Sequence, residues 1–185
     1  MKKVIIYFGE ELEKQPAVEK VLQAQSIPYR ILQDTDITQT VGTLLDLPGY
    51  EAQKPTAPKH HSIDLMLFEE ASDEEILALN EALAEQGVRM ERKAMLTKHN
   101  RDWIFQDLLA EIEKEHTYFQ IMADIKTLLM QSSELVIEAY TPASWKVYEE
   151  AFYTAYGCMN KECTLKEITA AYEQLKQAKQ ALIKR

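Results

Sequence analysis

Five residues near the N-terminus, Val-Ile-Ile-Tyr-Phe at positions 4–8, form an uninterrupted apolar run of β-branched and aromatic side chains. Such a run predicts a strand that is buried on both faces of its sheet. A similar run at 63–68 contains Asp64 as its polar member and predicts a second inner strand. Two stretches of mixed polarity, 29–32 and 88–96, are typical of half-exposed or edge strands. We therefore expect a sheet in which the first and third strands are the inner ones.

Helical patterns connect these strands in pairs. Between the first two, Pro16 can occupy the first turn of a helix whose apolar residues follow the i, i+3, i+4 spacing. Between the last two, Ser72 and Glu75 form a capping box, and Gly87 ends the helix in the left-handed conformation. A doubled strand-helix-strand pattern with these inner strands predicts an α+β fold, a ferredoxin-like βαβ-βαβ sandwich. A doubly wound α/β sheet is the alternative.

The segment 34–62 lies between the two strand-helix-strand units and breaks their symmetry. Residues 38–47 can form a short helix, and Pro48-Gly49 predicts a turn. We expect this segment to be an insertion or a mobile loop.

The rest of the chain is predicted to be helical. Residues 101–131 contain neither proline nor glycine, so one helix can run through them, with one end on the sheet and the other in a second bundle. Thr141 with Pro142 predicts the start of a further helix, which Gly157 is expected to stop. Thr164 and Glu167 form a second capping box. We predict a small three-helix bundle that shares the long helix, and two domains, 1–118 and 119–185.

Composition restricts the partners and the compartment. The chain of 185 residues has 46% hydrophobic residues, 21 Lys and Arg, 30 Asp and Glu, and a formal net charge of −9. The basic residues form no run that could follow a phosphate backbone, so we expect no nucleic-acid partner. We also expect no membrane association, because no apolar run approaches the length of a membrane span. The N-terminal apolar run is too short for a signal peptide, which predicts a cytoplasmic protein whose two cysteines are reduced.

Two sets of residues carry resemblances to known families. The first set is Lys93-Ala94-Met95-Leu96-Thr97, Asn100, Trp103, residues 111–116, and Thr40-Val41-Gly42-Thr43-Leu44-Leu45-Asp46-Leu47-Pro48-Gly49. With these residues the chain resembles, over about 1–118, a bacterial family of uncharacterised proteins, domain of unknown function 3783. This resemblance implies no activity, because none is established for the family. Lys98-His99 departs from the residues that the family usually has before the asparagine.

The second set lies near the C-terminus and consists of Tyr140-Thr141-Pro142-Ala143-Ser144-Trp145, Ala151, Ala155 and the helix at 164–182. With these residues the segment 120–185 is similar to a FIVAR repeat, a small three-helix module. The resemblance implies carbohydrate or surface binding, a role suspected for such repeats in extracellular proteins.

One cluster of polar and aromatic residues is the candidate ligand site. It consists of Lys93, Thr97, His99, Asn100, Arg101 and Trp103. A strand passes to a helix there, so free backbone N–H groups and the helix dipole favour an anion, and Arg101 can add a charge-assisted contact. In the alternative interpretation, Asn100 caps the helix and Trp103 packs on the sheet.

No residue is assigned to catalysis or to a metal. Cys158 and Cys163 lack a second pair at the spacing of a zinc site, and no glycine-rich phosphate loop is present. We therefore predict no cofactor and a non-enzymatic binding or regulatory module that acts through protein–protein contacts. A small-anion sensor or an enzyme at the junction around Asn100, and carbohydrate binding by the C-terminal bundle, are the alternatives. The oligomeric state is left open.

Overall fold

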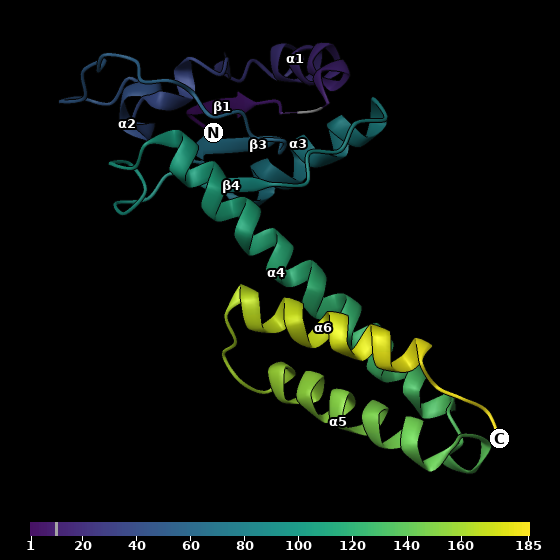
Figure 1. Cartoon of the computed structure of the whole chain (residues 1–185). Helices are drawn as coiled ribbons and strands as arrows, with labels where there is room; N and C mark the ends of the chain where they lie inside the picture. Colours follow the sequence, from purple (N-terminus) through teal and green to yellow (C-terminus); the bar gives the residue numbers. More distant parts are fainter. Residues whose placement is uncertain (10) are drawn as a thin grey trace. The chain divides into compact units, whose positions relative to one another are not determined.

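The protein consists of two compact units, which we call the sheet unit, Met1–Glu113, and the helical unit, Lys114–Arg185. The computed structural model describes residues 1–9 and 11–185. The division falls inside the helix α4, Phe105–Gln131, so this helix contributes its first turns to one unit and its last turns to the other (Figure 1). One helix therefore runs from the sheet unit into the helical unit, as predicted.

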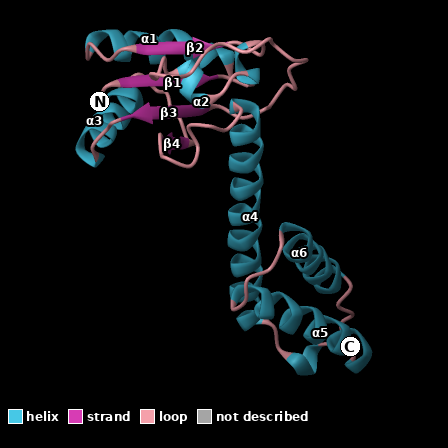
Figure 2. Cartoon of the chain, turned by 90° about the vertical axis from the view of Figure 1, so that its left-hand side faces the viewer, coloured by secondary structure: helices cyan, strands magenta, loops and turns pink. Residues whose placement is uncertain are grey.

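The sheet has four strands in the order β2-β1-β3-β4 (Figure 2). Their bounds are β1 Lys3–Tyr7, β2 Tyr29–Leu32, β3 Leu65–Glu69 and β4 Lys93–Met95. β1 is parallel to β2 and β3 is parallel to β4, whereas β1 and β3 are antiparallel. The α+β class is confirmed. The two most apolar strands, β1 and β3, are the inner strands of the sheet, as predicted, and they bury side chains on both faces.

The strand order differs from that of a ferredoxin-like sandwich. In the interleaved arrangement, the two strands of each strand-helix-strand unit are separated by a strand of the other unit. Here they are direct neighbours, as in the pairing of Val4 with Tyr29. The long segment 33–64 accounts for the difference, because it carries the chain to the free edge of β1, where β3 pairs in the opposite direction. The antiparallel central pair also distinguishes the fold from a doubly wound parallel sheet.

Two helices cover one face of the sheet. They are α1, Gln15–Ala24, and α3, Asp73–Glu85. Their apolar faces form one core with the strand residues that point to that side, listed as Val4, Ile6, Met66, Phe68, Val18, Val21, Leu22, Leu79 and Leu83. The predicted ends of α3 are confirmed, because Ser72 and Glu75 form the capping box and Gly87 has φ +71.

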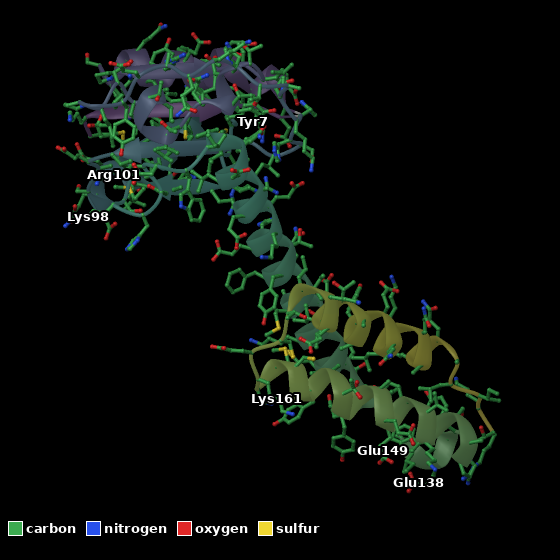
Figure 3. All side chains as sticks on the ribbon, turned by 60° about the vertical axis from the view of Figure 1, so that its left-hand side comes forward. Tyr7, Lys98, Arg101, Glu138, Glu149 and Lys161 are labelled. Carbon is green, nitrogen blue, oxygen red and sulfur yellow. The ribbon has the colours of Figure 1, made fainter. Side chains whose placement is uncertain are left out.

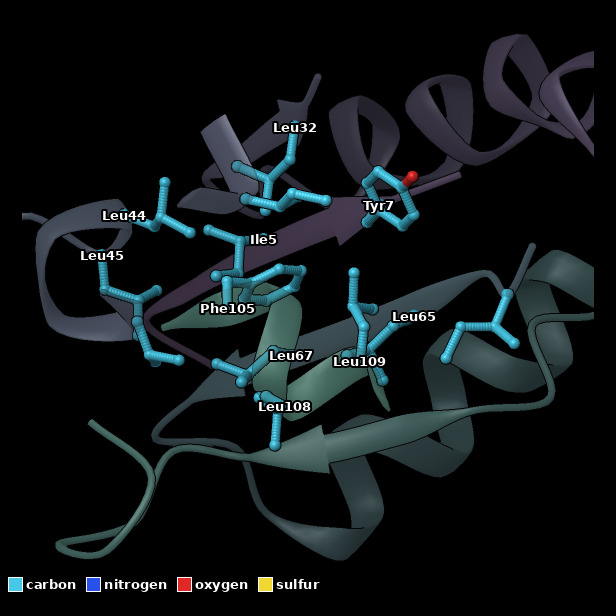
Figure 4. Packing of buried hydrophobic residues seen from close by; sticks show 13 residues of the cluster. Ile5, Tyr7, Leu32, Leu44, Leu45, Leu65, Leu67, Phe105, Leu108 and Leu109 are labelled. Carbon is cyan, nitrogen blue, oxygen red and sulfur yellow. The ribbon is translucent and has the colours of Figure 1, made fainter. Parts of the chain in front are cut away.

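The other face of the sheet is covered by the short helix α2, Val41–Leu44, and by the first turns of α4. Figure 4 shows this second core, in which Phe105 and Leu109 meet Ile5 and Leu67. The predicted short helix in the inserted segment is therefore confirmed, and it packs into the core. The fourth strand is shorter than the predicted range 88–96. Val88 and Met90 belong to the loop before β4, and their side chains are buried in the core beneath α1 and α3.

The helical unit combines the later turns of α4 with α5, Pro142–Met159, and α6, Leu165–Gln180. Thr141 and Thr164 cap these helices as predicted, and Ile125, Tyr148, Ala155, Ile168 and Leu175 are in the buried core. The prediction that Gly157 stops α5 is wrong. Gly157 keeps a helical backbone, and the helix continues to Met159. Short 3₁₀ helices occur at Leu12–Lys14, Asp36–Thr38, Ser132–Glu134 and Ile137–Ala139.

Candidate functional site

The predicted junction after β4 is built around a turn that Asn100 closes. Its side-chain oxygen accepts a hydrogen bond of 2.8 Å from the Thr97 amide, and its side-chain nitrogen donates one of 2.8 Å to the Met95 carbonyl. The Asn100 amide donates to the Thr97 hydroxyl oxygen at 3.1 Å. The polar groups of Asn100 thus hold the end of β4 and the turn together, and they do not cap a helix.

The helix after this turn begins later than predicted. It starts at Phe105 rather than Arg101, because the segment between them bonds to the N-terminus of α2. The carbonyl of Arg101 accepts from the Gly42 amide at 2.8 Å, and the carbonyl of Trp103 accepts from the Val41 amide at 2.9 Å. The segment 40–49 and the segment after β4, which both carry the first resemblance, are therefore bonded to each other. This contact gives both segments a structural role.

The other predicted site residues have separate partners or are exposed. The Lys93 ammonium donates to the Met90 carbonyl, and burial lowers the pKa of Lys93. His99 and Trp103 are exposed, and the Arg101 Nε lies 3.7 Å from a carboxylate oxygen of Asp102. The structure thus joins Thr97 to Asn100 by hydrogen bonds and directs Lys93 and Arg101 to other partners. The anion site at this junction stays a prediction.

Replacing Asn100 with alanine is expected to destabilise the sheet unit by about 1–2 kcal/mol, because a carbonyl and an amide lose their side-chain partner. Thermal unfolding followed by circular dichroism measures the change. Lys98→Ala is the matched control, since this exposed side chain lies in the same turn. Equal unfolding temperatures for the two variants would contradict the role that we assign to Asn100.

The structure also brings together three polar residues outside the predicted site. The Tyr7 hydroxyl donates to Oδ1 of Asp34 at 2.7 Å, and Nδ1 of His60 lies 3.4 Å from Oδ2 of the same carboxylate. Burial and the hydrogen bond to Asp34 raise the pKa of Tyr7 to about 12. The same hydrogen bond is the main reason why the pKa of Asp34 is lowered. These three side chains lie at a cleft of about 490 Å³, which we call the Tyr7 cleft.

The Tyr7 cleft is at the edge of the sheet where β1 and β2 end. Figure 3 shows Tyr7 at one edge of the sheet unit and Arg101 with Lys98 at the opposite edge. Part of this site could have been found from the sequence. Tyr7 is the last residue of β1 and Asp34 comes shortly after β2. Ligands often bind beyond the carboxyl ends of such parallel strands. No sequence signal connects His60 to Tyr7 and Asp34.

The helical unit carries the two cysteines and several exposed aromatic rings. Cys158 and Cys163 are free thiols in contact, and burial, followed by the hydrogen bond with Cys163, raises the pKa of Cys158 to about 11. In residues 1–9 and 11–185 no group of three or more metal-binding side chains comes together. Tyr153 and Tyr156 are exposed, and the ring of Phe152 is parallel to that of Tyr156 at 6.4 Å. Carbohydrate binding at these rings stays a prediction.

Three exposed aliphatic side chains lie on two segments of the helical unit that backbone hydrogen bonds connect. Val136, Ile137 and Ile183 are 59%, 48% and 61% exposed. The chain segments that carry them are held side by side, because the Thr141 amide donates to the Ile183 carbonyl at 2.8 Å and the Arg185 amide donates to the Ala139 carbonyl at 3.0 Å. We call these three residues the aliphatic patch.

Taken together, the chain is an α+β protein with a mixed four-stranded sheet and a separate helical unit. Residues 64–119 match the profile of a family described as a domain of unknown function (DUF3783). This match confirms the first resemblance over β3, α3, β4 and the first half of α4. The junction around Asn100 lies inside the matched segment, whereas Tyr7, Asp34 and His60 lie before it.

The other comparisons add no relative. No curated protein and no solved structure matches the chain. The resemblance of the C-terminal segment to a FIVAR repeat is not supported by the comparisons. In the part of the chain that the structure describes, no helix is both long and apolar enough to cross a membrane.

Proposed function

We propose that the protein is a non-enzymatic binding module that acts in the cytoplasm and contacts a protein partner through the aliphatic patch. The observation that supports this proposal is the exposure of three large aliphatic side chains on two segments that backbone hydrogen bonds hold together. Single exposed apolar residues are ordinary, but contiguous ones mark interaction surfaces, because their burial is favourable by about 25 cal/mol per Å².

The surroundings of the patch support a protein as the partner. Glu134 and Glu138 flank Val136 and Ile137, and Lys184 and Arg185 follow Ile183, and all four charged residues are exposed. An apolar centre with a charged rim is the usual arrangement of a protein–protein interface. These four neighbours along the chain carry both signs of charge, so we expect a partner with an apolar surface and a mixed charged border rather than a uniformly charged polymer.

The double variant Ile137→Glu, Ile183→Glu is expected to lose capture of the partner, because it places two carboxylates in the centre of the interface. Affinity capture from native lysate with quantitative mass spectrometry measures the loss. Leu77→Glu is the matched control, because Leu77 is 58% exposed on α3 in the sheet unit. We expect this control to capture the same partner as the unchanged protein. The proposal fails if the double variant retains that partner, or if the unchanged protein captures none.

A further inference from the structure

The Tyr7 cleft combines a fixed carboxylate with an apolar wall at the carboxyl ends of β1 and β2. We propose that it binds a small primary alkylamine, whose ammonium group pairs with Asp34 and whose alkyl chain lies against the apolar wall. This site is in the sheet unit and shares no residue with the aliphatic patch, so it goes beyond the proposed function and can fail or succeed independently of it.

The carboxylate of Asp34 is held in place by two neighbours and keeps free acceptor positions. Tyr7 donates to one of its oxygens at 2.7 Å, and the imidazole of His60 lies 3.4 Å from the other. The Tyr7 hydroxyl is itself fixed, since it accepts from the His61 amide at 3.3 Å. A carboxylate offers about four acceptor positions, so Asp34 can still accept from a ligand. Its side chain is 48% exposed and therefore reachable.

The carboxylate of Asp34 favours a cation in this cleft, where its neighbouring basic group is the imidazole of His60 at 3.4 Å. The Lys14 ammonium is already bound by the carboxylate of Glu11, lies 3.7 Å from Asp64, and donates to the Arg89 carbonyl at 3.1 Å. The local lysine is therefore occupied by the protein's own acceptors, whereas Asp34 faces the cleft. An anionic ligand would meet Asp34 at this place, but an ammonium group offers it three donors and the opposite charge.

The apolar part of the cleft distinguishes an organic amine from a metal cation. Phe8, Leu12 and Ile31 line the cleft, and Leu12 is 62% exposed. An alkyl chain that lies on these side chains removes apolar surface of both partners from water. A hydrated metal ion gains nothing from such a wall, and Mg²⁺ or Ca²⁺ prefers several oxygen ligands around it. A short aliphatic amine matches both parts of the site.

Titration with butylamine, followed by two-dimensional amide NMR at constant ionic strength, tests the proposal. We expect saturable shifts at the amides of Gly9, Gln33 and Thr35, which line the cleft. Asp34→Asn keeps the shape of the side chain and removes its charge, so binding should weaken about tenfold or more. Glu81→Gln, an exposed carboxylate on α3, is the matched control and should bind as the unchanged protein does.

Three further ligands separate the contributions. Butanol has an alkyl chain without the charge and should bind much more weakly than butylamine. Inorganic phosphate should not shift the cleft amides. Nα-acetyl-lysine methylamide presents the same ammonium group on an amino-acid side chain, so tighter binding of it than of butylamine would identify a lysine side chain as the natural source of this group.

A second variant keeps the test decisive if Asp34→Asn alters the fold. Leu12→Ser shortens the apolar wall and leaves Asp34 in place, so binding of butylamine should weaken several-fold. The proposal is overturned if butylamine produces only unsaturable shifts spread over acidic surfaces, if phosphate binds the cleft instead, or if Asp34→Asn folds normally and binds butylamine with unchanged affinity.

Discussion

Replacing Phe105 with alanine is expected to lower the free energy of unfolding of the sheet unit by about 3–5 kcal/mol. Phe105 is the first residue of α4 and has no exposed surface. Its ring fills the core between the sheet and α2, in the cluster that contains Ile5, Leu44 and Leu67. Alanine would leave a cavity there, because the two strands and both helices hold its walls apart. Amide hydrogen exchange of β1 and β3, read by mass spectrometry, reports this unit separately.

The same helix provides the control. Phe119→Ala removes the same side chain at a position that is 61% exposed, so we expect a change within about 0.5 kcal/mol. Phe119 belongs to the helical unit, so this control tests whether loss of any phenyl ring from α4 lowers the protection of β1 and β3. Equal protection of β1 and β3 in the two variants would mean that α4 does not close the sheet core as described.

Gly9→Ala is expected to destabilise the sheet unit by about 1–3 kcal/mol or more. A Cβ atom at this position would lie 2.4 Å from the His61 carbonyl oxygen and 2.7 Å from the Ile63 amide nitrogen. Both are backbone atoms, so one of the two chain segments must move, and Phe8 and Ile63 on these segments are buried. The movement would also strain the hydrogen bond of 2.9 Å from the Gly9 amide to Asp64. Urea-induced unfolding monitored by hydrogen exchange of β1 measures the loss.

Gly157→Ala is the matched control and should act in the opposite direction. No atom lies within 4 Å of a Cβ built on Gly157, and this residue has a helical backbone in α5. Alanine is preferred over glycine in a helix by about 0.5–1 kcal/mol, so the helical unit should become more stable. If Gly9→Ala leaves the stability of the sheet unit unchanged, residues 61–63 do not approach Gly9 as closely as described.

The candidate sites were only partly predictable. Asn100 was selected from the sequence as a polar residue at a strand end, but its partners, Thr97 and Met95, give it a structural role in a turn. The start of α4 was misplaced because the carbonyls of Arg101 and Trp103 bond to α2, which is distant in the sequence. Tyr7, Asp34 and His60 were not connected, because three separate segments deliver them to one edge of the sheet.

The sequence by itself determined the local elements of this protein. The apolar runs of β1 and β3, the capping boxes at Ser72 and Thr164, and the unbroken α4 pattern act over a few residues, so each could be recognised without knowing its neighbours. Only the tertiary structure decided which strand pairs with which and where the Tyr7 cleft forms. Those features depend on how the segment 33–64 returns the chain to the edge of β1, and the free energy of that closure is spread over contacts between residues far apart in the sequence.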